Sequence, residues 1–344
     1  MKVADMHCDT ISSLFEKRRE GKQESLYKNS GHIDLLKLEK GEALLQNFAI
    51  FVNKGKTDNP LEEFLRMADL YYRELEENRD RIAPVFCWED MERNMQEGKI
   101  SALLTVEEGG VCKGSLSYLR NIYRLGVRMM TLTWNYPNEI GYPNICAGTY
   151  LGHMPQAESG WMGERVPFYR IADTKNGLTD KGVEIVREME RIGMIIDVSH
   201  LSDKGFHDVA EVTQKPFVAS HSNARTVCPW VRNLTDGMIR KLAARGGVMG
   251  LNFCPDFLME VSEGESNSGT IAGIAEHAKY ITNVGGIDCL GLGSDFDGID
   301  GHGELPDYSY LPMLADALLK TGFSGSDVEK IFHKNVLRVY KELL

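Results

Sequence analysis

Eight short apolar runs recur along the chain, with polar segments between them. They cover residues 3–8, 44–52, 101–106, 127–133, 194–198, 217–220, 247–251 and 290–293. Most are nearly continuous apolar runs, a pattern typical of parallel strands that are covered on both faces. Stretches with the apolar spacing of helices lie between them, for example residues 60–78, 116–125, 179–192 and 271–284. Thr179 or Asp180 is expected to cap the third of these helices.

Alternation of eight strands with helices predicts an α/β protein with a closed (β/α)8 barrel, the TIM barrel. An open, doubly wound sheet is the alternative. A barrel of this type reaches 344 residues as one unit, so we expect a single domain over residues 1–344. The segment 136–168 is rich in Gly, Pro and Asn and is expected to be a functional lid or binding loop. The polar stretch 260–270 is expected to be a surface loop.

Composition narrows the class of protein. The chain has 39 Lys and Arg against 50 Asp and Glu, a net charge of -11, which argues against nucleic acid as a partner. We see neither a signal peptide nor an apolar run of about 18 residues, so no membrane association is expected. The seven cysteines are scattered without a CxxC pair. A reducing compartment fits them best, and we expect a cytoplasmic protein.

Polar side chains follow five of the eight predicted strands. His7 and Asp9 end the first strand as an H-x-D pair, and residues two apart in a strand face the same side. Glu108 follows the third strand and abuts two glycines, which favours it over the neighbouring Glu107. The fifth, sixth and eighth strands are followed by His200, His221 and Asp295.

The shared position of these residues indicates one metal site, because barrel enzymes place their catalytic groups at the carboxyl ends of the strands. Imidazole nitrogens and carboxylate oxygens are zinc ligands, and a bridging Glu108 would let five side chains hold two ions. Taken singly, the H-x-D pair could be a local hydrogen bond and each histidine could be structural. The remaining histidines lack this position and are expected on the surface or on helices: His32, His153, His207, His277, His302 and His333. Of these, His153 lies in a loop that could cover the site.

The motifs that contain these residues match a known family. They are DMHCDT, NFAIFV, VEEGG, LGVRMMTLTWN, GLTDKG, MIIDVSH, SHSNAR, VRNLTD, GGVMGLNF and GLGSDFDG, and they run nearly end to end. The chain resembles the membrane (renal) dipeptidase family of zinc peptidases, within the amidohydrolase-like barrels. The resemblance implies a (β/α)8 barrel with two zinc ions, other divalent transition metals being possible, and a homodimer.

Residue by residue, the resemblance implies that His7 and Asp9 bind one zinc ion and that His200 and His221 bind the other. Glu108 becomes the bridge between the ions, Asp295 the catalytic acidic residue, and Arg232 the residue that binds the substrate carboxylate.

Two positions depart from the family pattern. Trp134 stands where animal members carry a histidine that is thought to orient the scissile carbonyl, so zinc, Asn135 or another group would take that role. We therefore expect Trp134 and Asn135 in the substrate site. Cys254 stands where some members have an aromatic residue. Both changes bear on the choice of substrate more than on the type of reaction.

The implied reaction is the hydrolysis of dipeptides with a free C-terminal carboxylate, L-Xaa-D-Xaa as well as L-Xaa-L-Xaa. A hydroxide between the ions would attack the carbonyl, and Asp295 would carry the proton to the leaving amine. Another hydrolase on the same site, such as a lactonase or an N-acyl amino acid deacylase, is the nearest alternative. A non-catalytic binding barrel is an alternative of a different class.

Overall fold

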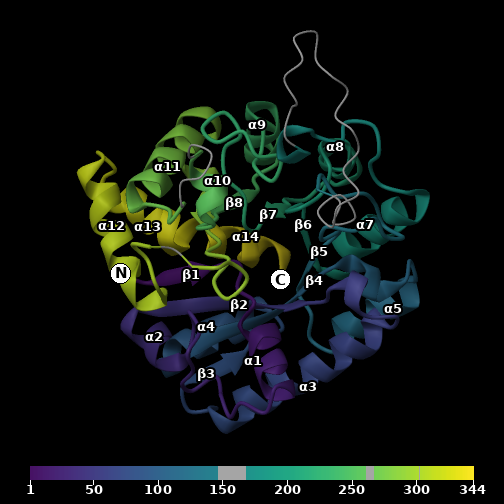
Figure 1. Ribbon diagram of the computed structural model, residues 1–344, viewed down its shortest axis with the longest axis horizontal. Coiled ribbons are helices and arrows are strands. Elements are labelled where there is room, and N and C mark those ends of the chain that lie inside the picture. Colours follow the sequence, from purple (N-terminus) through teal and green to yellow (C-terminus); the bar gives the residue numbers. More distant parts are fainter. Residues whose placement is uncertain (146–167, 261–266, 302) are drawn as a thin grey trace.

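Eight parallel strands form a closed barrel in the computed structural model, which describes residues 1–145, 168–260, 267–301 and 303–344 (Figure 1). They are β1 (Val3–Asp5), β2 (Ala43–Phe51), β4 (Ile100–Glu107), β5 (Met129–Thr131), β6 (Ile195–Asp197), β7 (Val218–Ala219), β8 (Val248–Leu251) and β9 (Leu290–Leu292). The order is β2-β1-β9-β8-β7-β6-β5-β4, and pairing of β2 with β4 closes the ring. The eight predicted strands and the closed barrel are confirmed, and the open sheet is excluded.

A ninth strand, β3 (Ile82–Pro84), is not predicted by the sequence pattern. It pairs with the first residues of β4, from Ile82 opposite Ile100 to Pro84 opposite Ala102. Further along β4, the partner is β5. Because β2 occupies the other edge of β4, β3 and β5 share one edge, and β3 is an addition beside the barrel wall.

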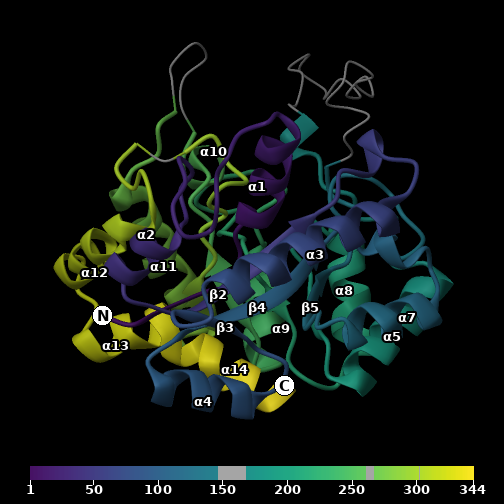
Figure 2. The same cartoon turned by 90° about the horizontal axis from the view of Figure 1, so that it is seen from below.

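Helices surround the barrel (Figures 1 and 2). They are α1 (Thr10–Arg19), α2 (Leu35–Lys40), α3 (Pro60–Glu77), α4 (Trp88–Glu97), α5 (Leu116–Arg124), α7 (Asp180–Ile192), α8 (Asp203–Val212), α9 (Asp236–Ala244), α10 (Pro255–Leu258), α11 (Ile271–Gly285), α12 (Leu311–Lys320), α13 (Gly325–Glu329) and α14 (Asn335–Leu343). The four predicted helices are α3, α5, α7 and α11. Thr179 caps α7, because its hydroxyl accepts a hydrogen bond from the amide of Gly182 at 3.0 Å. Among the described residues, no helix is long and apolar enough to cross a membrane.

The amino-terminal end of the barrel is closed by α14, which lies across it in Figure 2. Val336 and Tyr340 of α14 join one buried cluster with Leu103 and Met129 inside the barrel. The Tyr340 hydroxyl also accepts a hydrogen bond from the side-chain amide of Asn47 at 2.6 Å. Side chains of α14 therefore fill the amino-terminal end of the barrel interior, and the barrel opens toward solvent at the carboxyl ends of its strands.

Strand β4 shows how side chains divide between the two sides of the barrel wall. Leu103 belongs to the inner cluster, whereas Leu104 and Val106 belong to the outer core beneath the helices. Side chains in a strand alternate between faces, so Thr105 and Glu107 share the inner face with Leu103. Glu107, the last residue of β4, therefore projects toward the open end of the barrel.

Candidate metal centre

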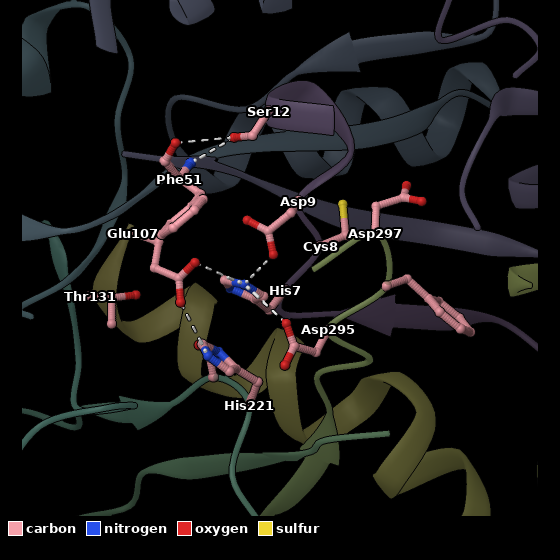
Figure 3. A network of polar contacts seen from close by, with 12 residues as sticks. His7, Cys8, Asp9, Ser12, Phe51, Glu107, Thr131, His221, Asp295 and Asp297 are labelled. Atoms are coloured by element: carbon pink, nitrogen blue, oxygen red, sulfur yellow. Dashed lines mark hydrogen bonds and ion pairs between the residues drawn. The ribbon is translucent and has the colours of Figure 1, made fainter. Parts of the chain in front are cut away.

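The carboxylate of Glu107 lies at the centre of a buried group of histidines and acidic residues above the barrel interior (Figure 3). Its Oε1 is 2.9 Å from Nε2 of His200 and 3.5 Å from Nε2 of His221. Its Oε2 is 3.7 Å from Nε2 of His7. One carboxylate thus faces histidines from three strand ends with its two different oxygens.

Three overlapping groups of side chains could each hold a cation. They are His7 with Asp9 and Glu107, Glu107 with His200 and His221, and His7 with His221 and Asp295, and the ligand atoms of each group lie within 4.8 Å of one another. In the first group, Nε2 of His7 is 3.3 Å from Oδ2 of Asp9. The other oxygen of Asp9 is buried and accepts no hydrogen bond from any described residue. Glu107 belongs to two of the groups, which is the arrangement that two neighbouring ions require.

Hydrogen bonds fix which nitrogen of His200 and His221 faces Glu107. Nδ1 of His200 is 2.9 Å from the amide oxygen of Asn135, an acceptor, so Nδ1 carries the proton. Nδ1 of His221 is 2.7 Å from the hydroxyl of Ser220. That hydroxyl donates its own proton to Asp197, so it accepts from His221. Both rings therefore turn an unprotonated Nε2 toward Glu107.

Lone pairs thus meet in the centre of the site. The two Nε2 atoms are 3.0 Å apart, with the Glu107 carboxylate beside them. Burial lowers the pKa of His200 and His221 well below the usual range, which keeps both rings neutral. Neutral imidazoles and carboxylates directed at one point are the donor set that a divalent transition metal prefers. The residues present therefore fit a metal ion.

The raised pKa values of His7 and Glu107 also indicate that the site attracts positive charge. Burial alone lowers the pKa of His7, but the carboxylates of Asp9, Glu107 and Asp295 outweigh it and raise that pKa to about 10. The pKa of Glu107 is raised well above its usual range by burial, and then by the charge of Asp9. Protons are retained here because several carboxylates share one dry site, and metal ions would replace those protons.

A buried aspartate, Asp197, fixes the position of Ser220, the residue that binds His221. It accepts hydrogen bonds from the amides of Ser199 and Ser220 at 3.0 and 2.8 Å. It also accepts bonds from the hydroxyls of Ser220 and Thr131, both at 2.6 Å. Asp197 thereby ties together the ends of three neighbouring strands and orients the serine that binds His221.

Asp5 repeats this arrangement on the other side of the barrel. Its carboxylate accepts bonds from the amide of His7 at 3.2 Å and from the amide and hydroxyl of Ser294 at 2.9 and 2.6 Å. Ser294 immediately precedes Asp295. Neither aspartate was predicted from the sequence, although each is a charged residue at the end of an apolar strand, which is a signal of such a role.

The structure contradicts the prediction that Glu108 bridges the ions: Glu108 belongs to none of the three groups, whereas Glu107, the competing candidate, belongs to two of them. Glu108 has a left-handed backbone with φ 110°. Its Oε1 accepts hydrogen bonds from the amide of Gly110 at 2.7 Å and the side chain of Asn138 at 2.6 Å. Its Oε2 accepts one from the amide of Trp134 at 3.2 Å. Glu108 therefore braces the loops after β4 and β5.

The two glycines that favoured Glu108, Gly109 and Gly110, are required by the tight turn that follows it. A Cβ atom on Gly110 would lie 2.4 Å from Oε1 of Glu108, and one on Gly109 would lie 2.6 Å from the carbonyl oxygen of Leu132. Only glycine fits at such close approach. Glu107 lies on the inner face of β4 together with Leu103, but both faces of this strand are apolar, so the sequence does not reveal which residue faces inward.

Asp295 joins the centre from the end of β9. Its backbone is left-handed with φ 62°. Oδ1 lies 3.8 Å from Nε2 of His7, and Oδ2 accepts a hydrogen bond from the side chain of Asn252 at 2.8 Å. Burial raises the pKa of Asp295 to about 6. One oxygen is thus anchored while the other faces the group of ligands.

A cavity of about 960 Å³ opens above these residues. Its lining includes Asp9, Glu107, Trp134, Asn135, His200, Arg232, Cys254 and Asp295. Arg232 is only 3% exposed, and its guanidinium carbon lies 5.4 Å from the centre of the Phe257 ring. Its Nη2 donates to the carbonyl of His221 at 3.3 Å, while its Nε is buried without a partner in the described part of the chain. The cavity therefore contains a buried cation with hydrogen-bonding capacity to spare.

The two substrate-site residues expected beside the metal differ in their contacts. Trp134 packs edge-on against Phe51, with ring centres 4.8 Å apart, and forms part of the cavity wall. Asn135 binds His200 and so holds a candidate ligand; its role toward substrate stays a prediction. His153, with residues 146–167 of the expected lid and residues 261–266 of the expected surface loop, lies outside the described residues.

Comparisons with known proteins agree with this geometry. The family model described as membrane dipeptidase (peptidase family M19) matches residues 1–343. A curated relative, the dipeptidase tcpJ of Claviceps purpurea, is 31% identical over 324 residues, which are 91% of this chain and 70% of that protein.

Solved structures share the whole architecture. The dipeptidase AC, a metallo peptidase of family M19, is 27% identical with a TM-score of 0.85, and the match covers 100% of this chain and 98% of that one. A metallo peptidase from Rhodobacter sphaeroides is 25% identical with a TM-score of 0.86, covering 100% and 99%. That enzyme was crystallised with a phosphinate mimic of the dipeptide L-Ala-D-Ala.

Proposed function

This chain belongs to the membrane dipeptidase family, peptidase family M19, and is a metallo-dipeptidase; we propose that it uses two zinc ions to hydrolyse dipeptides that carry a free C-terminal carboxylate. Membership excludes the alternative of a non-catalytic barrel. The chemistry of the donor set supports zinc, since nitrogen and oxygen ligands at a partly open, buried site are typical of catalytic zinc.

The residues divide between the two ions as the distances suggest. His7 and Asp9 would hold one ion, His200 and His221 would hold the other, and Glu107 would serve both with its two oxygens. Zinc supplies Lewis acidity, which polarises a carbonyl group and lowers the pKa of water. The protein contributes rigid ligands, because Asn135 and Ser220 fix the two imidazoles that share Glu107.

Arg232 is the observation that carries the choice of substrate. The guanidinium of Arg232 is buried in the same cavity as the candidate metal ligands, and its Nε has no hydrogen-bond partner among the described residues, so it can still bind an anion. A carboxylate can accept two parallel hydrogen bonds from an arginine, a geometry that lysine cannot reproduce. We therefore assign the C-terminal carboxylate of the dipeptide to Arg232, which leaves the scissile bond over the metal ligands.

Asp295 is the proposed proton carrier. Oδ1 faces the ligand group, while Asn252 restrains the other oxygen. From this position Oδ1 would take a proton from the attacking water and deliver it to the amine of the departing residue. The reaction then breaks the C–N bond, forms a C–O bond, and returns the carboxylate to its starting state.

We further propose that the enzyme accepts a D-residue at the C-terminal position as well as an L-residue. The phosphinate of L-Ala-D-Ala in the Rhodobacter sphaeroides relative supports this range. The aromatic wall of Phe51 and Trp134 would face the substrate side chains. The homodimer and the cytoplasmic location expected from the sequence stay predictions.

The experiment that tests this function compares Arg232→Ala with the parent enzyme on a dipeptide and on the same dipeptide as its C-terminal amide. Loss of a charge-assisted, two-pronged contact is expected to raise KM for the dipeptide by about 10²-fold, with little change in the binding of the amide. Both proteins should contain the same amount of zinc. Equal losses on acid and amide would contradict the assignment of Arg232, and failure of the parent on an L-L and L-D dipeptide library would contradict the function.

A further inference from the structure

The backbone that carries Arg232 is held by a second arginine. Nη2 of Arg225 donates to the carbonyl of Val231 at 3.0 Å, and Nε donates to the carbonyl of Asn233 at 2.8 Å. These are the residues on the two sides of Arg232. One planar guanidinium thus grips the chain immediately before and immediately after the residue that reaches into the cavity.

Arg225 is itself locked by Asp203 at the start of α8. Nη1 and Nη2 lie 2.8 and 2.7 Å from the two carboxylate oxygens, a two-pronged pair. The side chain of Asn144 joins the same pair, because its Nδ2 donates to Asp203 at 2.8 Å and to the Val231 carbonyl at 2.9 Å. Both charged side chains are largely buried, at 16% and 12% exposure. A partly buried, fully bonded network of this kind is rigid.

In contrast, the side chain of Arg232 has few restraints of its own. It donates one bond to the His221 carbonyl and lies over Phe257, and its Nε is unpartnered among the residues that the structure describes. Its direction therefore depends on the backbone from which it projects. That backbone is held at the carbonyl of Val231, which Arg225 and Asn144 both bind, and at the carbonyl of Asn233, which Arg225 binds.

We propose that Arg225 is a positioning residue for substrate binding: by holding the carbonyls on both sides of Arg232, it sets the direction in which that guanidinium enters the cavity. The inference rests on the proposed role of Arg232 toward the substrate carboxylate. Lysine cannot replace Arg225, because a single ammonium group cannot span Asp203 and two separate carbonyls. The hydrogen bonds of Arg225 go to Asp203 and to the carbonyls of Val231 and Asn233, and none of these residues is a candidate metal ligand.

The test is the variant Arg225→Lys, assayed with a dipeptide and with its C-terminal amide as a competitive inhibitor. Misplacement of Arg232 is expected to raise KM for the dipeptide about tenfold, to leave kcat within about threefold, and to leave the inhibition constant of the amide unchanged. Zinc content should equal that of the parent. An unchanged KM, or equal losses for acid and amide, would overturn the proposal.

Arg245→Lys is the matched control. Arg245 also donates to two carbonyls, those of Thr213 and Ala210 at 2.6 and 2.9 Å, but it holds the end of α8 away from the cavity. The Arg245→Lys variant should lower Tm and leave KM for the dipeptide unchanged. If Arg225→Lys does not fold, Asn144→Ala removes one donor to Val231 and should raise KM in the same selective way, by a smaller factor. If KM for the dipeptide does not rise selectively in Asn144→Ala, the proposal is overturned.

A double variant separates this inference from the proposed function. In an Arg232→Ala background, Arg225→Lys should have no further effect on KM, because the group it positions is gone. If the parent does not hydrolyse the L-L and L-D dipeptides, the proposed function fails, and if Arg232→Ala does not discriminate acid from amide, the proposed role of Arg232 fails. If Arg232→Ala discriminates and Arg225→Lys does not, only the positioning role of Arg225 fails.

Discussion

Ser220 accepts the Nδ1 proton of its neighbour His221 across 2.7 Å, and this bond determines that Nε2 faces Glu107. We predict that Ser220→Ala weakens metal binding about 10- to 100-fold, because the imidazole loses the partner that fixes its tautomer and orientation. Competition with a chelator, followed by metal analysis, measures the effect. Ser294→Ala is the control: Ser294 also binds a buried aspartate, Asp5, but contacts no imidazole. Equal metal affinity in the two variants would contradict the prediction.

Glu107→Gln and Glu108→Gln should behave as opposites, although the residues are adjacent. The first variant removes the charge shared by three histidines and is expected to lose roughly half or more of the bound metal, and with it activity. The second should keep both ions. An amide at position 108 would turn its NH2 group toward the amide of either Gly110 or Trp134, lowering the free energy of unfolding by about 1–3 kcal/mol.

Metal analysis and denaturant unfolding of these two variants provide the comparison. Loss of metal in Glu108→Gln, with retention in Glu107→Gln, would restore the assignment that the sequence first suggested.

Asp295→Asn should retain both metal ions and lose turnover by about 10²-fold or more, since an amide cannot accept the proton from the attacking water. Steady-state kinetics on metal-matched protein measures the loss. Asp297→Asn is the control, because Asp297 binds the hydroxyl of Thr10 and the amide of His32 at 2.6 Å each and has a supporting role. Near-normal turnover in Asp295→Asn would remove Asp295 from the reaction.

His277 predicts an acid limit to stability that does not involve the metal centre. It is fully buried; its Nδ1 accepts from the amide of Ala224 at 3.1 Å, and its Nε2 donates to the carbonyl of Leu258 at 2.9 Å. Burial lowers the pKa of His277 from 6.5 to about 4. Between these values the unfolded chain binds more protons than the folded one. The stability that His277 contributes is therefore complete above about pH 6.5 and is lost as the pH falls toward 4.

The loss should approach about 3 kcal/mol of unfolding free energy across that window. Urea unfolding of the parent and of His277→Gln at matched metal content measures it, because the contribution of the metal ligands cancels in the difference. If the unfolding free energies of the two proteins depend on pH in the same way, protonation of His277 does not destabilise the fold and the prediction is wrong.

The barrel was predictable because each of its strands is a separate apolar run. The register of side chains within a run was harder to predict. In β4, apolar residues occupy both faces, so Leu103 and Leu104 gave no obvious phase, and the choice between Glu107 and Glu108 was made on the glycines instead. β3 was missed because it pairs only with the start of β4 and lies outside the ring of eight strands, so the barrel pattern did not require it.

Roles that depend on distant partners were also beyond the sequence. The contact of Asp197 with Ser220 and that of Arg225 with Asp203 join residues 23 and 22 positions apart. Spacing of this kind carries no periodic signal. Most of the candidate ligands could be predicted because they follow strands at equivalent places, whereas Glu107 is the last residue of β4 itself and was passed over for Glu108.

Closure of the barrel joins β1 to β9, with Asp5 opposite Leu292. The amino-terminal part of the chain carries His7, Asp9 and Glu107, and the later part carries His200, His221 and Asp295. A nascent or partly folded chain therefore has only fragments of the reaction centre. Bringing such remote segments together costs loop-closure entropy, which only the closed barrel repays. The candidate ligand groups are therefore complete only when the first and last strands of the barrel have met.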